Sequence, residues 1–345
     1  MIVLTLGMIV HAAMIGLTLA SATQRIAGAR ASLDKPNIVM LFVDDLGYGD
    51  TGFNGHPTTV TPNIDALAWN GKILTTWYSA CPVCSCSRAS LMTGRQWSRM
   101  GIPGVFGPTV SSGLPLNETT VAGELSSAGY ATGAVGKWHL GQRIPYLPAA
   151  RGFDEYLGIP YSDDMGDARA TPCDDSGMRS PPGGKLDKVD IILDPYVEAG
   201  LAPRPSRSEI QDPAGAFLPL VSQRKGPGGV VNTTVVEQPL DFSRLSQKYS
   251  DFATTFISDH AAEPFFLYMP FSHVHTTAAN QPEKQFCGCD FKNATARGAF
   301  GDALAETDWI VGNVVAALKV TPLGAPSYPP HSHSITPSHQ SVAPR

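Results

Sequence analysis

Short continuous apolar runs alternate along the chain with segments in which apolar residues recur every three to four positions. The runs predict strands, the first of them buried on both faces, at 37–43, 73–79, 131–135 and 265–269. The recurring pattern predicts helices, the first with Thr61 as its N-cap, at 61–71, 120–128, 243–260 and 301–319. Ligands of open α/β sheets gather beyond the carboxyl ends of the strands, so the residues that follow the runs are the first candidates for chemistry.

The chain divides into three parts by composition. Residues 1–22 are apolar and end in an Ala-x-Ala signature, which predicts a cleaved signal peptide; an uncleaved membrane anchor is the alternative, because the stretch approaches spanning length. Residues 36–319 carry the periodic pattern, except for a Pro-, Gly- and Asp-rich stretch at 163–230 that predicts a long, largely irregular excursion. Residues 320–345 are rich in Pro, Ser and His and are predicted to be disordered.

The composition is that of a globular protein, with 43% hydrophobic and 16% charged residues among 345. A net charge of -5 argues against a nucleic-acid-binding surface. The six cysteines are too sparse for a disulfide scaffold. Three Asn-x-Thr sequons beside the predicted signal peptide favour the secretory pathway, with a lysosomal or secreted destination, and predict glycosylation at Asn117, Asn232 and Asn293.

A cysteine-rich segment at 81–95 is the most unusual stretch of the sequence. Cys84 stands just before Ser87, the expected N-cap of a short helix that stops at Gly94, so the positive end of that helix should favour the thiolate. Arg88 follows four residues later. Taken alone, the pattern also fits a small buried cysteine, a Cys-x-x-Cys redox pair or half of a zinc site, although no second Cys-x-x-Cys and no histidine pair at metal spacing completes a zinc site.

Other polar residues follow the predicted strands. Asp44 and Asp45 come directly after the first strand, where paired acids suit a hard cation but are also common in polar turns. Lys137 and His139 lie two residues apart between glycines after the third strand, which could place an ammonium and an imidazole on one anion. His275 follows the last strand, and by itself is most simply an ordinary loop histidine.

These motifs occur in an order that resembles the arylsulfatases of the A and G type, within the sulfatase family. The shared motifs are Asp-Asp-Leu-Gly-Tyr-Gly-Asp, Cys-x-x-Ser-Arg-x-x-x-x-Thr-Gly-Arg, Gly-Lys-Trp-His-Leu-Gly and Gly-Ile-Pro-Tyr-Ser, and the resemblance covers 36–319. It implies an alkaline-phosphatase-like α/β fold, a three-layer α/β/α sandwich with a mixed, mostly parallel sheet. It also implies a hydrolase of sulfate esters of aryl, lipid or carbohydrate alcohols.

The resemblance assigns the nucleophile and the metal. Cys84 would be oxidised to formylglycine by the formylglycine-generating enzyme, and a hydroxyl of the hydrated aldehyde would attack sulfur. Asp44, Asp45 and the Cys84 position would hold one Ca²⁺ ion, with Mg²⁺ as the alternative. Arg88 would hold the hydrated aldehyde.

The resemblance also assigns the residues that would contact the substrate. Lys137 and Ser162 would touch the sulfate or its ester oxygen. His139 would take the proton that lets the sulfated intermediate collapse, and His275 would protonate the leaving alcohol. Positive groups are needed because attack on sulfur builds charge on oxygens that are already anionic.

The sequence departs from the family pattern at several places. Cys86 stands where relatives usually carry Pro or Ala, and Asp163 stands where close relatives often carry His. The strand with an Asp-Asn-Gly metal motif that relatives carry after the helix at 301–319 has no counterpart here, so the predicted fold is incomplete at the C-terminus. The alternative function is therefore a catalytically inactive fragment or a binding-only relative. Phosphoryl transfer is disfavoured, because related phosphatases usually carry Ser or Thr at the nucleophile position.

Overall fold

The computed structural model describes residues 35–168, 173, 217–277 and 284–320. These residues form one six-stranded sheet in the order β1-β6-β2-β3-β4-β5. Strands β1, β6, β2 and β3 run parallel, and β4 and β5 add an antiparallel hairpin at one edge. The strands are β1 Ile38–Phe42, β2 Ala131–Val135, β3 Glu155–Gly158, β4 Leu220–Lys225, β5 Val231–Glu237 and β6 Phe265–Pro270. The prediction of a mixed, mostly parallel sheet is confirmed.

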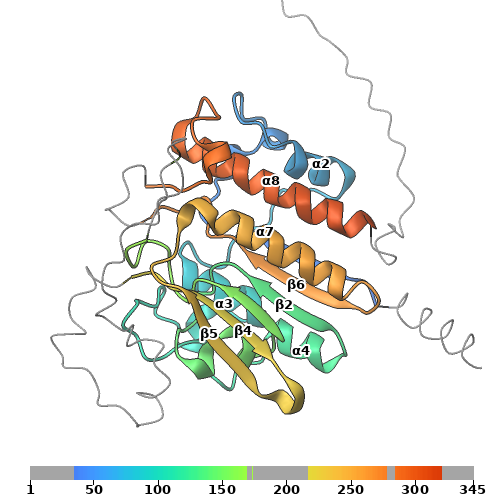
Figure 1. Ribbon diagram of the computed structural model, residues 1–345, viewed down its shortest axis with the longest axis vertical. Helices are drawn as coiled ribbons and strands as arrows, with labels where there is room; N and C mark the ends of the chain where they lie inside the picture. The colour runs from blue at the N-terminus through green and yellow to red at the C-terminus, as the bar shows by residue number, and fades with distance from the viewer. Residues whose placement is uncertain (1–34, 169–172, 174–216, 278–283, 321–345) are drawn as a thin grey trace, which may run out of the picture.

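Helices cover both faces of this sheet (Figure 1). Helices α7 and α8 pack over one face in one hydrophobic cluster, with α2 lying against α8, while α3 and α4 pack over the other face in a second cluster. The layers are therefore helix, sheet and helix, as predicted. The helices are α2 Pro62–Asn70, α3 Cys84–Thr93, α4 Val121–Ser127, α7 Phe242–Asp259 and α8 Gly298–Val320.

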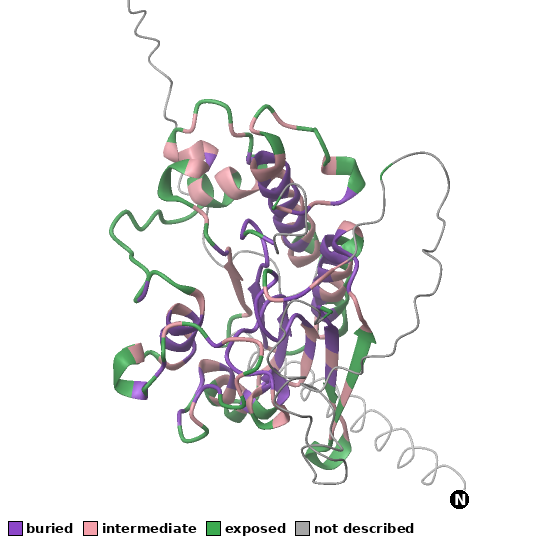
Figure 2. Ribbon diagram, turned by 90° about the vertical axis from the view of Figure 1, so that its left-hand side faces the viewer, coloured by how far each residue is buried: buried purple, intermediate pink, exposed green. Residues whose placement is uncertain are grey.

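Strand β6 shows how the sequence produces these layers. Successive side chains of a strand point to opposite faces, and those of Phe265, Leu267 and Met269 join the cluster under α7, whereas Phe266 and Tyr268 join the cluster under α3. All six residues of β6 are buried because neighbours flank the strand on both sides. Figure 2 shows this buried centre in purple.

Strand β1 was expected to be buried on both faces, and the structure agrees in part. Val39 and Leu41 pack against the cluster under α7, and Ile38, Met40 and Phe42 pack against the cluster under α3, but each of the five residues is only partly buried. The physical reason is its place in the sheet, since β1 is the edge strand beside β6 within the described residues.

Most predicted helices and strands are confirmed, but one predicted strand is absent and one helix start differs in detail. Thr61 is the N-cap residue of α2, as predicted, but its side chain makes no capping hydrogen bond; its hydroxyl accepts the N–H of Gly52 and donates to Asp65. The segment 73–79 forms no strand and is almost entirely exposed, although β-branched and aromatic residues are frequent in it. Such residues stabilise a strand only where a neighbouring strand accepts their backbone groups.

The excursion predicted at 163–230 is regular in part. Residues 220–237 form the β4–β5 hairpin, which the weak apolar alternation concealed. Residues 169–172 and 174–216 lie outside the described residues, as do the predicted signal peptide at 1–22 and the tail after Val320.

Two further observations concern the predicted location of the protein. None of the helices in the described ranges has the length and apolar character that a membrane crossing requires. The three sequon asparagines, Asn117, Asn232 and Asn293, are all exposed. Exposure is necessary for glycosylation, and the modification itself stays a prediction.

Candidate functional site

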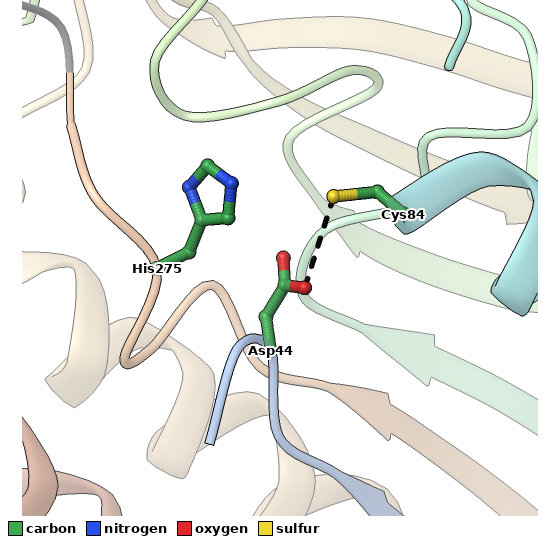
Figure 3. A group of neighbouring side chains, drawn as sticks. All are labelled: Asp44, Cys84 and His275. Carbon is green, nitrogen blue, oxygen red and sulfur yellow. Dashed lines mark hydrogen bonds between the residues drawn. The ribbon is translucent and has the colours of Figure 1, made fainter. Parts of the chain in front are cut away.

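Polar side chains converge beyond the carboxyl ends of the parallel strands. Asp44 follows β1, Lys137 follows β2 and His275 follows β6. Because parallel strands end at the same edge of a sheet, three segments distant in sequence meet there. Helix α3 brings Cys84 to the same place, and Figure 3 shows the side chains of Asp44, Cys84 and His275 pointing into one common space.

Cys84 is the first residue of α3. The prediction that Cys84 lies before the helix, with Ser87 as the N-cap, is therefore wrong. Val83 occupies the N-cap position, and no side chain caps the helix, so Ser87 lies inside the first turn rather than before it. The helix ends as predicted, at Gly94 with φ 66°. Residues four apart lie on one face of a helix, which explains why Arg88 reaches the same cluster as Cys84.

Asp44 lies at the centre of the cluster. Its Oδ2 is 2.5 Å from Lys137 Nζ and 3.1 Å from a guanidinium nitrogen of Arg88, and all three side chains are almost completely buried. Lys137 Nζ also donates to Cys84 Sγ at 3.5 Å, while Sγ lies 3.9 Å from Asp44 Oδ1. Burial alone would raise the pKa of Asp44, but the two cations outweigh it and lower the pKa to about 2. The site therefore holds an ionised carboxylate between two cations.

Asp163 is a site residue whose role was not predicted from the sequence. Its buried Oδ1 lies 3.4 Å from Lys137 Nζ and 3.4 Å from His275 Nδ1. On the other side of the imidazole, His275 Nε2 lies 3.6 Å from Oδ2 of the exposed Asp45. Burial alone would lower the pKa of His275, but the neighbouring Asp163 and Cys84 side chains raise it to about 11. His275 is therefore protonated at neutral pH and can donate a proton.

His139, in contrast to His275, is a neutral histidine. Burial, together with the nearby Lys137 and Arg88 cations, lowers the pKa of His139 to about 3, so the ring is neutral. Nε2 lies 2.8 Å from the carbonyl oxygen of Phe106 and must carry the proton that it donates there. Nδ1 then keeps its lone pair, and it has no hydrogen-bond partner in the described part of the chain. His139 can accept a proton at Nδ1.

Ser162 lies next to Asp163, directly after the predicted Gly-Ile-Pro-Tyr motif. It is buried, and its hydroxyl has no hydrogen-bond partner among the residues that the structure describes. A buried hydroxyl without a partner is costly, so a ligand oxygen would stabilise it. Its neighbour in sequence, Asp163, places Oδ1 3.4 Å from Lys137 Nζ.

The donor atoms fit a divalent cation. One ligand atom each from Asp44, Cys84 and His275 lie within 4.8 Å of one another, and the carboxylate of Asp45 is close to His275. The carboxylates suit a hard ion, whereas the thiol suits a softer one. The protonated imidazole of His275 has no lone pair to offer a cation. Replacement of the Cys84 sulfur by oxygen would make the set harder. The zinc and redox interpretations of the Cys81-x-x-Cys84 spacing do not hold in this structure, since Cys81 forms a disulfide with Cys86.

A second buried contact holds the loop that carries His275. His273 Nε2 lies 3.0 Å from Glu306 Oε2 on α8 and 3.1 Å from Ser246 Oγ on α7. The backbone of His273 accepts the N–H of Asp44 at 2.8 Å, and Val274 N–H donates to the Asp44 carbonyl at 2.8 Å. The sequence did not indicate this contact. The one available signal was a glutamate on the inward face of the predicted helix at 301–319.

Comparisons with known proteins agree with the geometry. A family model described as Sulfatase matches residues 36–324. Arylsulfatase A of Homo sapiens is 38% identical over 305 residues, a match that covers 85% of this chain and 50% of that protein. Arylsulfatase G of Canis lupus familiaris is 40% identical over 286 residues, which cover 81% of this chain and 46% of that protein. The chain thus spans about half the length of the curated relatives it matches.

Solved structures give the same result for the fold. The crystal structure of the PsFucS1 sulfatase from Pseudoalteromonas sp. superposes with a TM-score of 0.61 at 28% identity, covering 86% of this chain and 56% of that chain. The structure of Ps i-CgsB in complex with k-i-k-neocarrahexaose gives a TM-score of 0.58 at 27% identity, over 83% of this chain and 55% of that one. These matches confirm the alkaline-phosphatase-like fold class predicted from the sequence.

Proposed function

The chain belongs to the sulfatase family, and on this basis we propose that the protein hydrolyses sulfate esters at an aldehyde made from Cys84. The observation that carries the proposal is the buried cation pair at the Cys84 position. Lys137 Nζ lies 3.5 Å from Cys84 Sγ, and Arg88 reaches the same carboxylate of Asp44. Nucleophilic attack on a sulfate ester builds negative charge at this point, and preorganised cations stabilise that charge.

The two histidines would move protons in opposite directions. His275, protonated between Asp163 and Asp45, would donate its proton to the oxygen of the departing alcohol. His139, neutral with a lone pair on Nδ1, would accept the proton released when sulfate leaves the aldehyde position. Both transfers are general acid–base steps, which contribute about 10²–10⁴-fold each in enzymes. The hydroxyl of Ser162 would donate a hydrogen bond to a sulfate oxygen.

A metal ion belongs to the proposal. Asp44 and Asp45, with the oxygen that replaces the Cys84 sulfur, would hold Ca²⁺, and Mg²⁺ is the alternative for the same hard donors. Bound there, such an ion supplies further positive charge against the sulfate oxygens. The buried Lys137 and Arg88 keep Asp44 ionised, which prepares it to bind a cation.

The partners follow from the same chemistry. The substrate would be a sulfate ester of an aryl, lipid or carbohydrate alcohol, and the carbohydrate class is supported by the neocarrahexaose bound to one structural neighbour. The formylglycine-generating enzyme would convert Cys84. The predicted signal peptide and the exposed sequons support passage through the secretory pathway to a lysosomal or secreted destination.

An aryl sulfate assay on the secreted full chain tests the proposal. We expect 4-nitrophenyl sulfate to be hydrolysed, and we expect an aldehyde at Cys84 in the peptide mass spectrum. Cys84→Ala should abolish turnover, while Glu263→Ala, a surface change just before β6 and so at the opposite end of that strand from His275, should retain it. Turnover that survives in Cys84→Ala would overturn the assignment of the nucleophile.

The metal is tested with the same assay. Exhaustive chelation should lower the turnover of 4-nitrophenyl sulfate, and added Ca²⁺ should restore it. Restoration by Zn²⁺ and not by Ca²⁺ or Mg²⁺ would contradict the hard-ion assignment.

A further inference from the structure

Three cysteines lie within six residues, and the structure pairs two of them. Cys81 and Cys86 form a disulfide, with their Cα atoms 5.8 Å apart, and Cys84 stays outside it. Both paired residues are buried in the cluster under α3. The N–H of Cys86 also donates to the Gly104 carbonyl at 2.9 Å. The disulfide is therefore part of the core that supports the first turn of α3.

This pairing is one of three that the segment allows. Cys81 could instead pair with Cys84, because a two-residue spacing between cysteines readily closes a disulfide. That pairing would remove the Cys84 sulfur from Lys137 and leave Cys86 as a buried thiol. Nothing in the unfolded segment distinguishes Cys84 from Cys86 as a partner for Cys81, since both lie within a few residues of it.

We propose that oxidation of Cys84 to formylglycine selects the Cys81–Cys86 disulfide by removing the competing thiol. The proposal rests on the function proposed above and deepens it, because it makes the modification a folding step as well as a catalytic one. It also gives Cys86 a role at the position where the family pattern is broken: Cys86 is one half of a structural disulfide.

Burial within α3 fixes the order of events. Ser85, Cys86 and Arg88 are fully buried beside Cys84 in the folded chain. A modifying enzyme that recognises this segment cannot reach these residues after α3 has packed, so conversion comes first. Cys81 can afterwards pair only with Cys86 within this segment, because no third thiol remains there.

The chemistry balances at each step. Conversion oxidises the Cys84 side chain with dioxygen: one oxygen atom enters the aldehyde, the sulfur leaves as hydrogen sulfide, and two external thiols reduce the second oxygen atom to water and become a disulfide. Cys81 and Cys86 then lose two protons and two electrons to a small-molecule disulfide. If Cys84 remains a thiol, its thiolate can attack Cys81 Sγ and release the Cys86 thiolate, an exchange that requires no oxidant.

Peptide mapping under non-reducing conditions tests the proposal. The chain is expressed with and without the formylglycine-generating enzyme, total cell and secreted fractions are quenched in acid, and thiols are blocked with N-ethylmaleimide. Fragmentation of the peptide 73–88, which trypsin releases with all three cysteines, assigns the pairing. Because the total fraction is analysed, the result does not depend on whether each species is secreted.

The expected outcomes differ between species. Every molecule with an aldehyde at Cys84 should carry Cys81–Cys86, and so should the Cys84→Ser variant, which lacks the competing thiol. In unconverted wild-type chains, roughly half of the molecules should carry Cys81–Cys84 with a labelled Cys86, since two thiols of similar reach compete. The Cys173–Cys289 disulfide, present in the same digest, controls for reshuffling during the quench.

Failure of this inference can be distinguished from failure of the proposed function. If unconverted wild-type chains carry Cys81–Cys86 as completely as Cys84→Ser does, conversion does not select the disulfide and the inference is wrong. If no aldehyde forms even with the modifying enzyme, the proposed function fails, while the comparison between unconverted wild type and Cys84→Ser still decides the competition between thiols.

Discussion

Truncation of Glu306 to alanine should destabilise the protein by about 2–5 kcal/mol. Glu306 is buried, its Oε2 lies 3.0 Å from His273 Nε2, and its Oε1 accepts the N–H of Gly288 at 2.8 Å. The variant leaves two buried donors without this acceptor, at a cost of about 1–3 kcal/mol each. Removal of the carboxylate offsets part of that cost, because a buried carboxylate is itself expensive to desolvate.

Glu263 provides a matched control for this experiment. It forms the same kind of carboxylate–imidazole contact with His260 at 2.7 Å, but its side chain is 56% exposed. Exposed pairs of this type contribute about 0–1 kcal/mol, so Glu263→Ala should change stability little. Glu306→Gln should fall between the two alanine variants, because its amide oxygen can still accept from Gly288.

Urea denaturation of the secreted variants, followed by tryptophan fluorescence, measures these differences. The free energy of unfolding comes from the midpoint and the slope of each transition. Equal losses in Glu306→Ala and Glu263→Ala would refute the reasoning, since burial would then not decide what the contact contributes.

Further changes probe the site and its support. Lys137→Met should lower the turnover of 4-nitrophenyl sulfate by about 10²–10³-fold with the aldehyde content at Cys84 unchanged, which mass spectrometry of the same sample checks. Asp163 helps to raise the pKa of His275 to about 11 against the lowering effect of burial. The stability that this contact contributes is complete below the ordinary histidine pKa and is lost as pH rises through about 11. Asp163→Asn should therefore move the alkaline loss of activity and stability to lower pH. An unchanged pH–rate profile would contradict this. Asp308 accepts hydrogen bonds from the backbone N–H groups of Asn63 and Ile64, in the first turn of α2, at 3.0 and 2.8 Å. Asp308→Ala should therefore lower the free energy of unfolding measured in urea by about 1–2 kcal/mol, as the loss of a helix cap does. Turnover should be unchanged.

The central layers were predictable from the sequence because their signals are local. The run at 265–269 is continuously apolar, and a strand with neighbours on both sides needs that pattern. The helix at 243–260 carries apolar residues at helical spacing, and the structure places it at Phe242–Asp259. The failed strand at 73–79 shows the limit of such signals, because residues that favour strands form one only where another strand pairs with them.

Most residues of the site could be predicted from the sequence, but the contacts between them could not. Cys84, Lys137 and His275 were identified by motif, and the structure brings them together around Asp44. The place of Asp163 between Lys137 and His275 could not be predicted, because it depends on how the chain turns after β3. The disulfide between Cys81 and Cys86 was equally hidden, since three close cysteines allow several pairings.

The hydrogen bonds that join Asp44 to the loop after β6 determine which motions are available to the site. Two backbone bonds, from Asp44 N–H to His273 and from Val274 N–H to Asp44, continue the contact between β1 and β6 beyond the strands. Loops usually move on nanosecond to microsecond timescales, but these two segments can separate only if both bonds break. Asp44 and the backbone before His275 therefore move as one unit, and the motion left to His275 relative to Asp44 is rotation of its side chain.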